Sequence, residues 1–218
     1  MISAEHIFTV LYICLLIGIV LFGSYIVDEI GVYFYETKGN NKNGKIFDLV
    51  HEITPDLHEY EILVNIIPLI FLVLFLLVPN GFQLLKEFSG KFLLLCFIRA
   101  LTLIMTILPK HEKCNRRFEL ANCYKGQCYD KIFSGHTSFV FLAALIFLRE
   151  GLIPFWGLLG IVGVEMATIL VTRSHYTIDV FMALAITYLV YDGDYHIFSE
   201  FITKIEKDVT EVALEASS

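Results

Sequence analysis

The sequence predicts an all-α membrane protein built as a bundle of six transmembrane helices. Its residues are 56% hydrophobic and 18% charged, whereas a soluble domain is about half apolar and about a quarter charged. The mean hydropathy is correspondingly high, at +0.68. Several runs with at most one charge approach the roughly 20 residues that a helix needs to cross a bilayer. They are continuous rather than alternating, which is typical of helices and not of transmembrane β-strands.

Six stretches are candidates for these helices, and they predict one membrane domain over residues 1–218. The segment before the first stretch lacks the positive start of a secretory signal, so we expect a retained helix there. An acidic tail, 192–218, follows the last stretch. The predicted helices are 7–27, 62–79, 92–109, 132–148, 152–172 and 176–191.

Charge and cysteine usage narrow the possible functions. The formal net charge of -7 comes mainly from the first long loop and from the tail, which disfavours nucleic acid as a partner. Three cysteines, Cys114, Cys123 and Cys128, share one polar loop, so all three cannot pair with one another. In an oxidising lumen one disulfide is expected, for example Cys123 with Cys128, and the alternative is three free thiols.

Six spans would place the loops after the first, third and fifth helices on one side of the membrane. Both termini would lie on the other side. Lysine and arginine residues occur in short loops on both sides, so the positive-inside rule does not decide the orientation.

Two short motifs place ionisable side chains at helix starts on the same side of the membrane. One is Ser134-Gly-His136-Thr137, and the other is His175-Tyr-Thr-Ile-Asp179. Residues four apart share a helix face, so we expect Asp179 to accept a hydrogen bond from His175. The two histidines can supply a nucleophile and a general acid to a phosphorus centre. The alternative is two ordinary interfacial histidines, although ionisable groups at membrane depth usually have a function.

These motifs resemble those of the sphingomyelin synthases and ceramide phosphoethanolamine synthases, within the type 2 phosphatidic acid phosphatase superfamily. The segment from Cys128 to Thr137 is similar to the third family motif, which joins Cys-x-Asp to Ser-Gly-His-Thr. The segment from His175 to Asp179 is similar to the fourth. Arg99 followed by Thr106-Ile-Leu-Pro is similar to the second, and Ile53-Thr-Pro-Asp-Leu is a weaker echo of the first.

The resemblance implies a lipid phosphatase-like membrane domain that moves phosphocholine or phosphoethanolamine from a glycerophospholipid to ceramide. His175, oriented by Asp179, would attack phosphorus while His136 protonates the leaving diacylglycerol. Membrane lipids are the implied partners, with ceramide or diacylglycerol as acceptor, and no metal or other cofactor is needed. The implied location is the endoplasmic reticulum, the Golgi or the plasma membrane, with the site facing the lumen or the exterior; a homo-oligomer is left open. Candidate substrate-binding residues are Arg99, Asp130, Ser134, Thr137 and Tyr176.

Two other functions are compatible with the same histidines. A lipid phosphate phosphatase or phospholipase C-like hydrolase would pass the phosphoryl group to water. Phosphatases of this superfamily carry Lys, six residues and Arg-Pro, and an Arg six residues before the second His. Lys110 and Arg117 keep the first spacing, but Phe118 replaces the proline and Ile169 replaces the second Arg. Fewer cations favour a phosphodiester over a dianionic phosphate. The third alternative is a non-catalytic lipid-binding protein or channel.

Two charged residues are predicted to lie deepest in the membrane. Arg99 and Glu165 are each ten residues from a site-side landmark, Pro109 and His175, which is about 15 Å along a helix. An isolated charge near mid-bilayer costs at least about 2.5 kcal/mol. We therefore expect Arg99 and Glu165 to pair. The alternative is that Arg99 faces the substrate phosphate and Glu165 is protonated.

Overall fold

The computed structural model describes residues 4–37, 46–110, 114 and 128–193. Every regular element in these ranges is a helix, and they contain no strand, so the all-α prediction is confirmed for them. The predicted tail lies almost wholly outside the described residues. In chain order the elements are α1 (Ala4–Gly31), the π-helix η1 (Val32–Thr37), α2 (Leu49–Ile53), the 3₁₀-helix η2 (His58–Asn65), α3 (Ile66–Leu77), α4 (Gly81–Met105), α5 (Gly135–Arg149), α6 (Phe155–Val171) and α7 (Thr177–Asp192).

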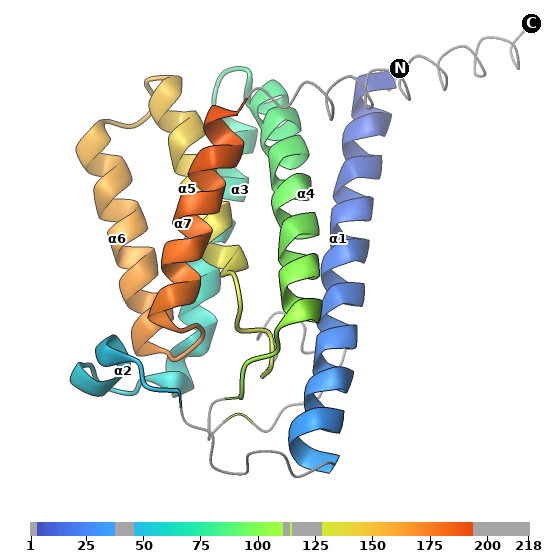
Figure 1. Cartoon of the computed structure of the whole chain (residues 1–218). Helices are drawn as coiled ribbons and strands as arrows, with labels where there is room; N and C mark the ends of the chain where they lie inside the picture. The colour runs from blue at the N-terminus through green and yellow to red at the C-terminus, as the bar shows by residue number, and fades with distance from the viewer. Residues whose placement is uncertain (1–3, 38–45, 111–113, 115–127, 194–218) are drawn as a thin grey trace, which may run out of the picture.

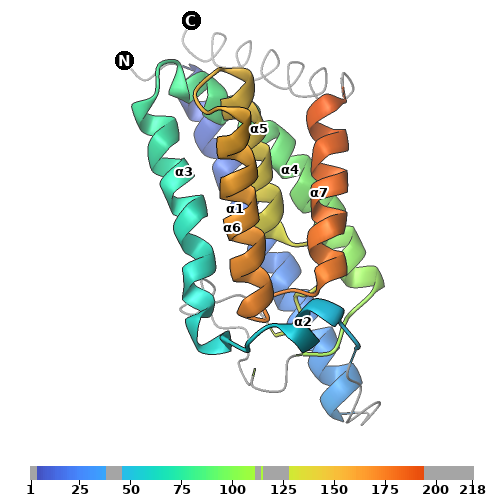
Figure 2. The same cartoon turned by 90° about the vertical axis from the view of Figure 1, so that its left-hand side faces the viewer.

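The long helices form one up-and-down bundle in which α5 is the central element (Figures 1 and 2). α5 packs against α3, α4, α6 and α7, while α1 packs against α4 at the edge. This position suits a helix that is apolar on nearly all sides, and nine of its 15 residues are buried. In the core, the Phe147 ring stands edge-on to Phe71 and Phe75, at centroid distances of 5.3 and 4.9 Å.

Large apolar side chains cover the outer faces of the bundle. Phe22 on α1, Leu76 on α3 and Trp156 on α6 are 66%, 74% and 78% exposed. A soluble monomer rarely exposes so much apolar surface, so this surface indicates an integral membrane protein. Among the described residues, three helical stretches are long and apolar enough to cross a membrane: Ile13–Gly31, His58–Leu77 and Gly81–Met105. α5, α6 and α7 are shorter, and the number of six spans stays a prediction.

The boundaries of α4 differ most from the prediction of 92–109. The helix already begins at Gly81, and two charged side chains that interrupt its apolar sequence, Glu87 and Lys91, have partners. Lys91 Nζ donates to a carbonyl at the end of α7 at 2.8 Å, and Glu87 pairs with Arg149. It ends at Met105, because the chain becomes extended ahead of a proline.

One end of the bundle, the lower end in Figure 1, gathers the start of α5, the end of α6 and the start of α7. The short helix α2, which the sequence did not predict, lies across this end. Asp48 caps it, because Asp48 Oδ1 accepts a hydrogen bond from His51 N at 3.1 Å. Both histidine motifs are therefore at the same end of the bundle.

Candidate active site

Ser134 begins α5 and thereby places His136 in its first turn. Ser134 Oγ accepts hydrogen bonds from Thr137 N at 3.2 Å and from Thr137 Oγ1 at 2.9 Å. Such a cap satisfies an N–H group that has no partner inside the helix. Gly135 leaves room for a neighbouring side chain, because a Cβ there would lie 3.3 Å from Arg99 Nε. Each residue of Ser-Gly-His-Thr thus has a distinct place, and the two hydroxyl residues bond to each other.

Both histidine motifs follow a residue whose backbone is in the left-handed region. Phe133 and Arg173 each have a φ of 59°, which costs a non-glycine residue roughly 1–2 kcal/mol. A cation fixes each of these turns. Arg99 Nε donates to the carbonyl of Phe133 at 2.9 Å, and Lys131 Nζ donates to the carbonyl of Arg173 at 3.1 Å. The surrounding contacts therefore hold both strained turns in place.

His175 is buried in the turn between α6 and α7. Its Nδ1 donates to the carbonyl of Lys131 at 2.6 Å, while Asp179 Oδ2 is 3.8 Å away. Asp179 Oδ2 instead accepts from the backbone N of Tyr176 at 3.0 Å. The expected hydrogen bond from His175 to Asp179 is therefore wrong. Asp179 is an electrostatic neighbour of the His175 ring, and the Lys131 carbonyl sets the tautomer of that ring. With Nδ1 engaged, Nε2 is the nitrogen that can attack a substrate.

His136 is positioned by Asn65, a residue that the sequence did not single out. His136 Nε2 lies 3.0 Å from Asn65 Oδ1 at the start of α3. An amide oxygen only accepts, so this contact places the ring proton on Nε2. The start of α5, which carries His136, is joined to the start of α7, because Ser134 N donates to the carbonyl of Asp179 at 3.4 Å. The structure therefore brings the two histidines into one site.

Arg99 pairs with Asp130 and not with Glu165. Arg99 Nη2 donates to Asp130 Oδ1, and the two side chains are only 12% and 10% exposed. Burial alone would raise the pKa of Asp130, but the guanidinium outweighs it, so the pKa lies below its ordinary value. The predicted Arg99–Glu165 pair is therefore wrong. Glu165 is buried on α6, and neither of its carboxylate oxygens has a hydrogen-bond partner among the described residues.

Tyr176 stands at the start of α7, beside His175. Its hydroxyl donates to the carbonyl of Pro109 at 3.4 Å, and its ring centroid is 5.4 Å from that of His51. Tyr176 therefore links the extended segment after α4 to the turn that carries His175. No group of three His, Cys, Asp or Glu residues in the described part of the chain is placed to hold a metal ion.

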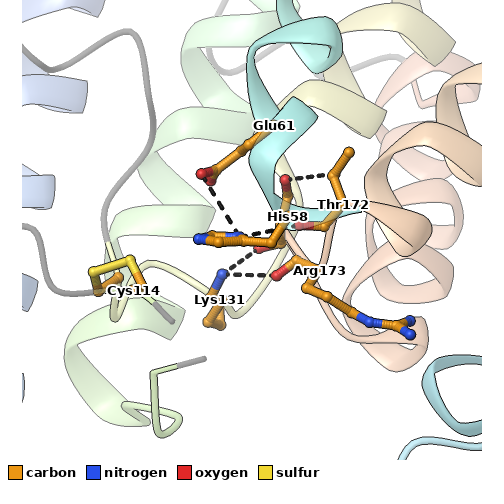
Figure 3. Close-up of a disulfide and its surroundings, with 8 residues drawn as sticks. His58, Glu61, Cys114, Lys131, Thr172 and Arg173 are labelled. Atoms are coloured by element: carbon orange, nitrogen blue, oxygen red, sulfur yellow. Dashed lines mark hydrogen bonds and ion pairs between the residues drawn. A yellow bond between two sulfur atoms is a disulfide. The ribbon is translucent and has the colours of Figure 1, made fainter. Parts of the chain in front are cut away.

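A disulfide joins Cys114 to Cys128. The expected pairing of Cys128 with Cys123 is therefore wrong, and Cys123 lies outside the described residues. The bridge ties down the chain just before Asp130 and Lys131, which both contact the site. Figure 3 shows Lys131 between this disulfide and the turn that contains Arg173.

Lys131 holds both the backbone and the ring of the candidate nucleophile. Its Nζ, which is buried, donates to the carbonyls of Arg173 and Ser174 at 3.1 and 2.7 Å. Those two residues directly precede His175, whose ring donates to the carbonyl of Lys131 itself. The sequence does not single out Lys131, because nothing local shows that its ammonium would reach Arg173, 42 residues away.

Replacing Lys131 with methionine should lower kcat roughly 100-fold and leave KM nearly unchanged. The variant loses the two hydrogen bonds to the turn but keeps the backbone carbonyl, so the His175 ring shifts while substrate contacts remain. Displacements of about 1 Å can have this effect on rate. Lys110→Met is the matched control, because Lys110 lies over the Tyr129 ring at 5.8 Å. Steady-state kinetics of both variants test this, and a native kcat for Lys131→Met would contradict it.

Residues 127–197 match the family model described as PAP2 superfamily C-terminal. The matched segment contains both histidine motifs and is about one third of the chain. It supports the type 2 phosphatidic acid phosphatase superfamily, whose members generally carry out phosphatase or phosphotransferase reactions on lipids. A search of curated proteins finds no match to the chain. With the apolar helices, the family match indicates an integral membrane enzyme of lipid metabolism.

Proposed function

We propose that this protein transfers a phospho-head group between membrane lipids through a histidine-linked intermediate. The donor is a glycerophospholipid that carries phosphocholine or phosphoethanolamine, and the acceptor is ceramide, as in the sphingomyelin synthases that its motifs resemble. One observation carries the proposal: His175, with Nδ1 held by a backbone carbonyl, lies at the same end of the bundle as His136, where Ser134 N donates to the carbonyl of Asp179 and joins the two motifs. One ring can attack phosphorus while the other moves a proton.

The reaction has two displacement steps. First, Nε2 of His175 forms a bond to phosphorus as the bond from phosphorus to the diacylglycerol oxygen breaks. His136, as an imidazolium with protons on both ring nitrogens, donates its Nε2 proton to that oxygen and becomes neutral. In this step the leaving oxygen replaces the Asn65 amide oxygen as the partner of Nε2. Asp179, 3.8 Å from the His175 ring, stabilises the positive charge that develops there. Then His136 takes a proton from the ceramide hydroxyl, whose oxygen attacks phosphorus, and the nitrogen–phosphorus bond breaks.

The cations that the structure describes around the site favour a phosphodiester substrate. Arg99 is paired with Asp130, while Lys131 donates to backbone carbonyls. The Arg173 guanidinium donates to the carbonyls of His51 and Thr54. A phosphate monoester carries up to two negative charges and benefits from several such cations, whereas a phosphodiester carries one. Because these cations are already bonded to protein groups, they suit the transfer of a singly charged phosphodiester better than the hydrolysis of a monoester.

The depth of the site suits a lipid substrate. α5, α6 and α7 have 15, 17 and 16 residues, about 22 to 26 Å at 1.5 Å per residue. The hydrocarbon core is about 30 Å thick, so helices this short place their site-side ends near its boundary, where phospholipid phosphates begin. The Cys114–Cys128 disulfide supports a site on the lumenal or exterior side, because disulfides persist in oxidising compartments.

A reconstitution assay tests the proposal. Purified protein in bilayers of phosphatidylcholine and phosphatidylethanolamine is given a fluorescent ceramide, and the lipids are separated afterwards. We expect a fluorescent sphingophospholipid and an equal amount of diacylglycerol. Hydrolysis is the second candidate, because the matched superfamily includes phosphatases. With phosphatidic acid added to the bilayers, a phosphatase would release inorganic phosphate, whereas a phospholipase C-like hydrolase would release phosphocholine or phosphoethanolamine, and neither would form labelled product. Unchanged lipids would contradict both reactions.

A further inference from the structure

Residues 46–57, which we call the interfacial segment, contact the site on their inner face. Asp48 Oδ2 accepts from Thr177 N at 2.6 Å, and Asp48 Oδ1 accepts from Thr177 Oγ1 at 2.8 Å. His51 Nε2 lies 3.0 Å from the carbonyl oxygen of His175. These contacts bind the segment to the backbone of the candidate nucleophile and to the first residue of α7.

Arg173 adds a second set of bonds to the same inner face. Its guanidinium donates to the carbonyls of His51 and Thr54 at 2.7 and 2.6 Å, and to Thr54 Oγ1 at 2.9 Å. Leu57 N donates to the carbonyl of Val171 at 2.8 Å. These backbone and side-chain groups of the segment thus bond to the turn between α6 and α7, and the segment cannot move far without moving that turn.

The outer face of the segment carries three large apolar side chains that no described residue covers. Phe47, Leu49 and Ile53 are 74%, 63% and 73% exposed, and none of the five residues of α2 is buried. Leu49 and Ile53 are four residues apart and so share one side of the helix. A helix with a polar side bonded inward and an apolar side left bare is typical of segments that lie in the membrane interface.

The position of the segment in the chain indicates what covers this face. The stretch His58–Leu77, long and apolar enough to cross a membrane, begins directly after it. Exposed apolar residues continue from the segment onto that stretch, at Ile62, Leu63 and Ile66. The outer face is therefore continuous with the lipid-facing surface of the bundle, at the depth where a membrane helix begins.

The charge of the segment indicates which lipids it fits. No lysine or arginine occurs between residues 46 and 61, whereas acidic residues are frequent there. Negative charge is repelled by an anionic leaflet, whereas a zwitterionic leaflet carries no net surface charge. The acidic residues are Asp48, Glu52, Asp56, Glu59 and Glu61.

We propose that Phe47, Leu49 and Ile53 form a bilayer-docking surface that lies in a zwitterionic leaflet beside the active site. Lipid covers the outer face while the inner face braces the turn that carries His175. The docking itself is independent of the reaction that the site performs, so it can be tested without an activity measurement.

The single tryptophan of the chain allows a direct test. Leu49→Trp and Ile53→Trp are each made in a Trp156→Phe background and reconstituted in phosphatidylcholine bilayers. We expect lipids brominated near the head group to quench both tryptophans, and aqueous iodide to quench them several-fold less than free N-acetyltryptophanamide. The native protein, whose Trp156 lies on the exposed face of α6, is the lipid-facing reference. Full iodide quenching with no bromine quenching at either position would overturn the proposal.

A second measurement tests the lipid preference. Replacing part of the phosphatidylcholine with phosphatidylserine should weaken the bromine quenching at position 49, because the acidic segment is repelled from the surface. Quenching of Trp156 in the native protein should not change in parallel. If bromine quenching at position 49 is equal or stronger in the anionic bilayer, the zwitterionic preference is wrong.

Discussion

Alanine at position 175 is expected to remove all measurable head-group turnover, because no nucleophile remains to accept the phosphoryl group. Alanine at position 136 should lower turnover roughly 10²- to 10⁴-fold, the usual contribution of a general acid–base group. Both rings lie at a polar end of the bundle, so the variants should still fold. Initial rates with the fluorescent ceramide measure the effect, and the elution profile in detergent checks the fold.

A third histidine at the same end of the bundle provides the matched control. His58 Nδ1 lies 3.3 Å from the carbonyl of Thr172, outside the pair of rings, so His58→Ala should keep most of the activity.

Asp179→Asn should reduce turnover nearly as much as Asp179→Ala does, because an amide cannot stabilise a charged imidazole. Near-native turnover in His136→Ala or His175→Ala would show that the site has been assigned to the wrong residues.

The lengths of the apolar runs were enough to predict the helical bundle. One local contact, between His175 and Asp179, was predicted wrongly. The i, i+4 rule predicted a hydrogen bond from His175 to Asp179 because it assumed that both residues are helical. The structure begins α7 at Thr177, so His175 lies in the preceding turn and its ring reaches the Lys131 carbonyl instead. The rule is valid only where both residues lie within the helix.

Contacts across the chain could not be predicted from local pattern. Asn65 and His136 are 71 residues apart, and Asp48 and Thr177 are 129 residues apart, so no spacing rule joins them. The Arg99–Glu165 prediction failed for a related reason. Counting residues along a helix gives the depth of a Cα atom, whereas a long arginine side chain carries its charge toward the polar end of the bundle. There it meets Asp130.

The Arg99–Asp130 pair should therefore have a large effect on stability. Arg99→Gln and Asp130→Asn are each expected to lower the free energy of unfolding by roughly 3–5 kcal/mol, because the remaining charge is left buried without its partner. The double variant should recover much of this loss. Glu87→Gln is the matched control, because Glu87 and Arg149 pair at the opposite end of α5 with 30% and 40% exposure, and such pairs contribute about 1 kcal/mol or less.

Acid should weaken the same pair, and the pKa of Asp130 determines the pH range in which this happens. That pKa is lowered from the ordinary value of 3.8, so the stability that the pair contributes is fully present above that value. It is lost as the pH falls through the folded-state pKa. Native protein should be more stable than Asp130→Asn at neutral pH, and the difference in Tm should shrink below pH 3.8, because protonated aspartic acid then resembles asparagine. Thermal unfolding in detergent across this range measures it. A difference in Tm that stays constant would mean that the charge on Asp130 does not stabilise the fold.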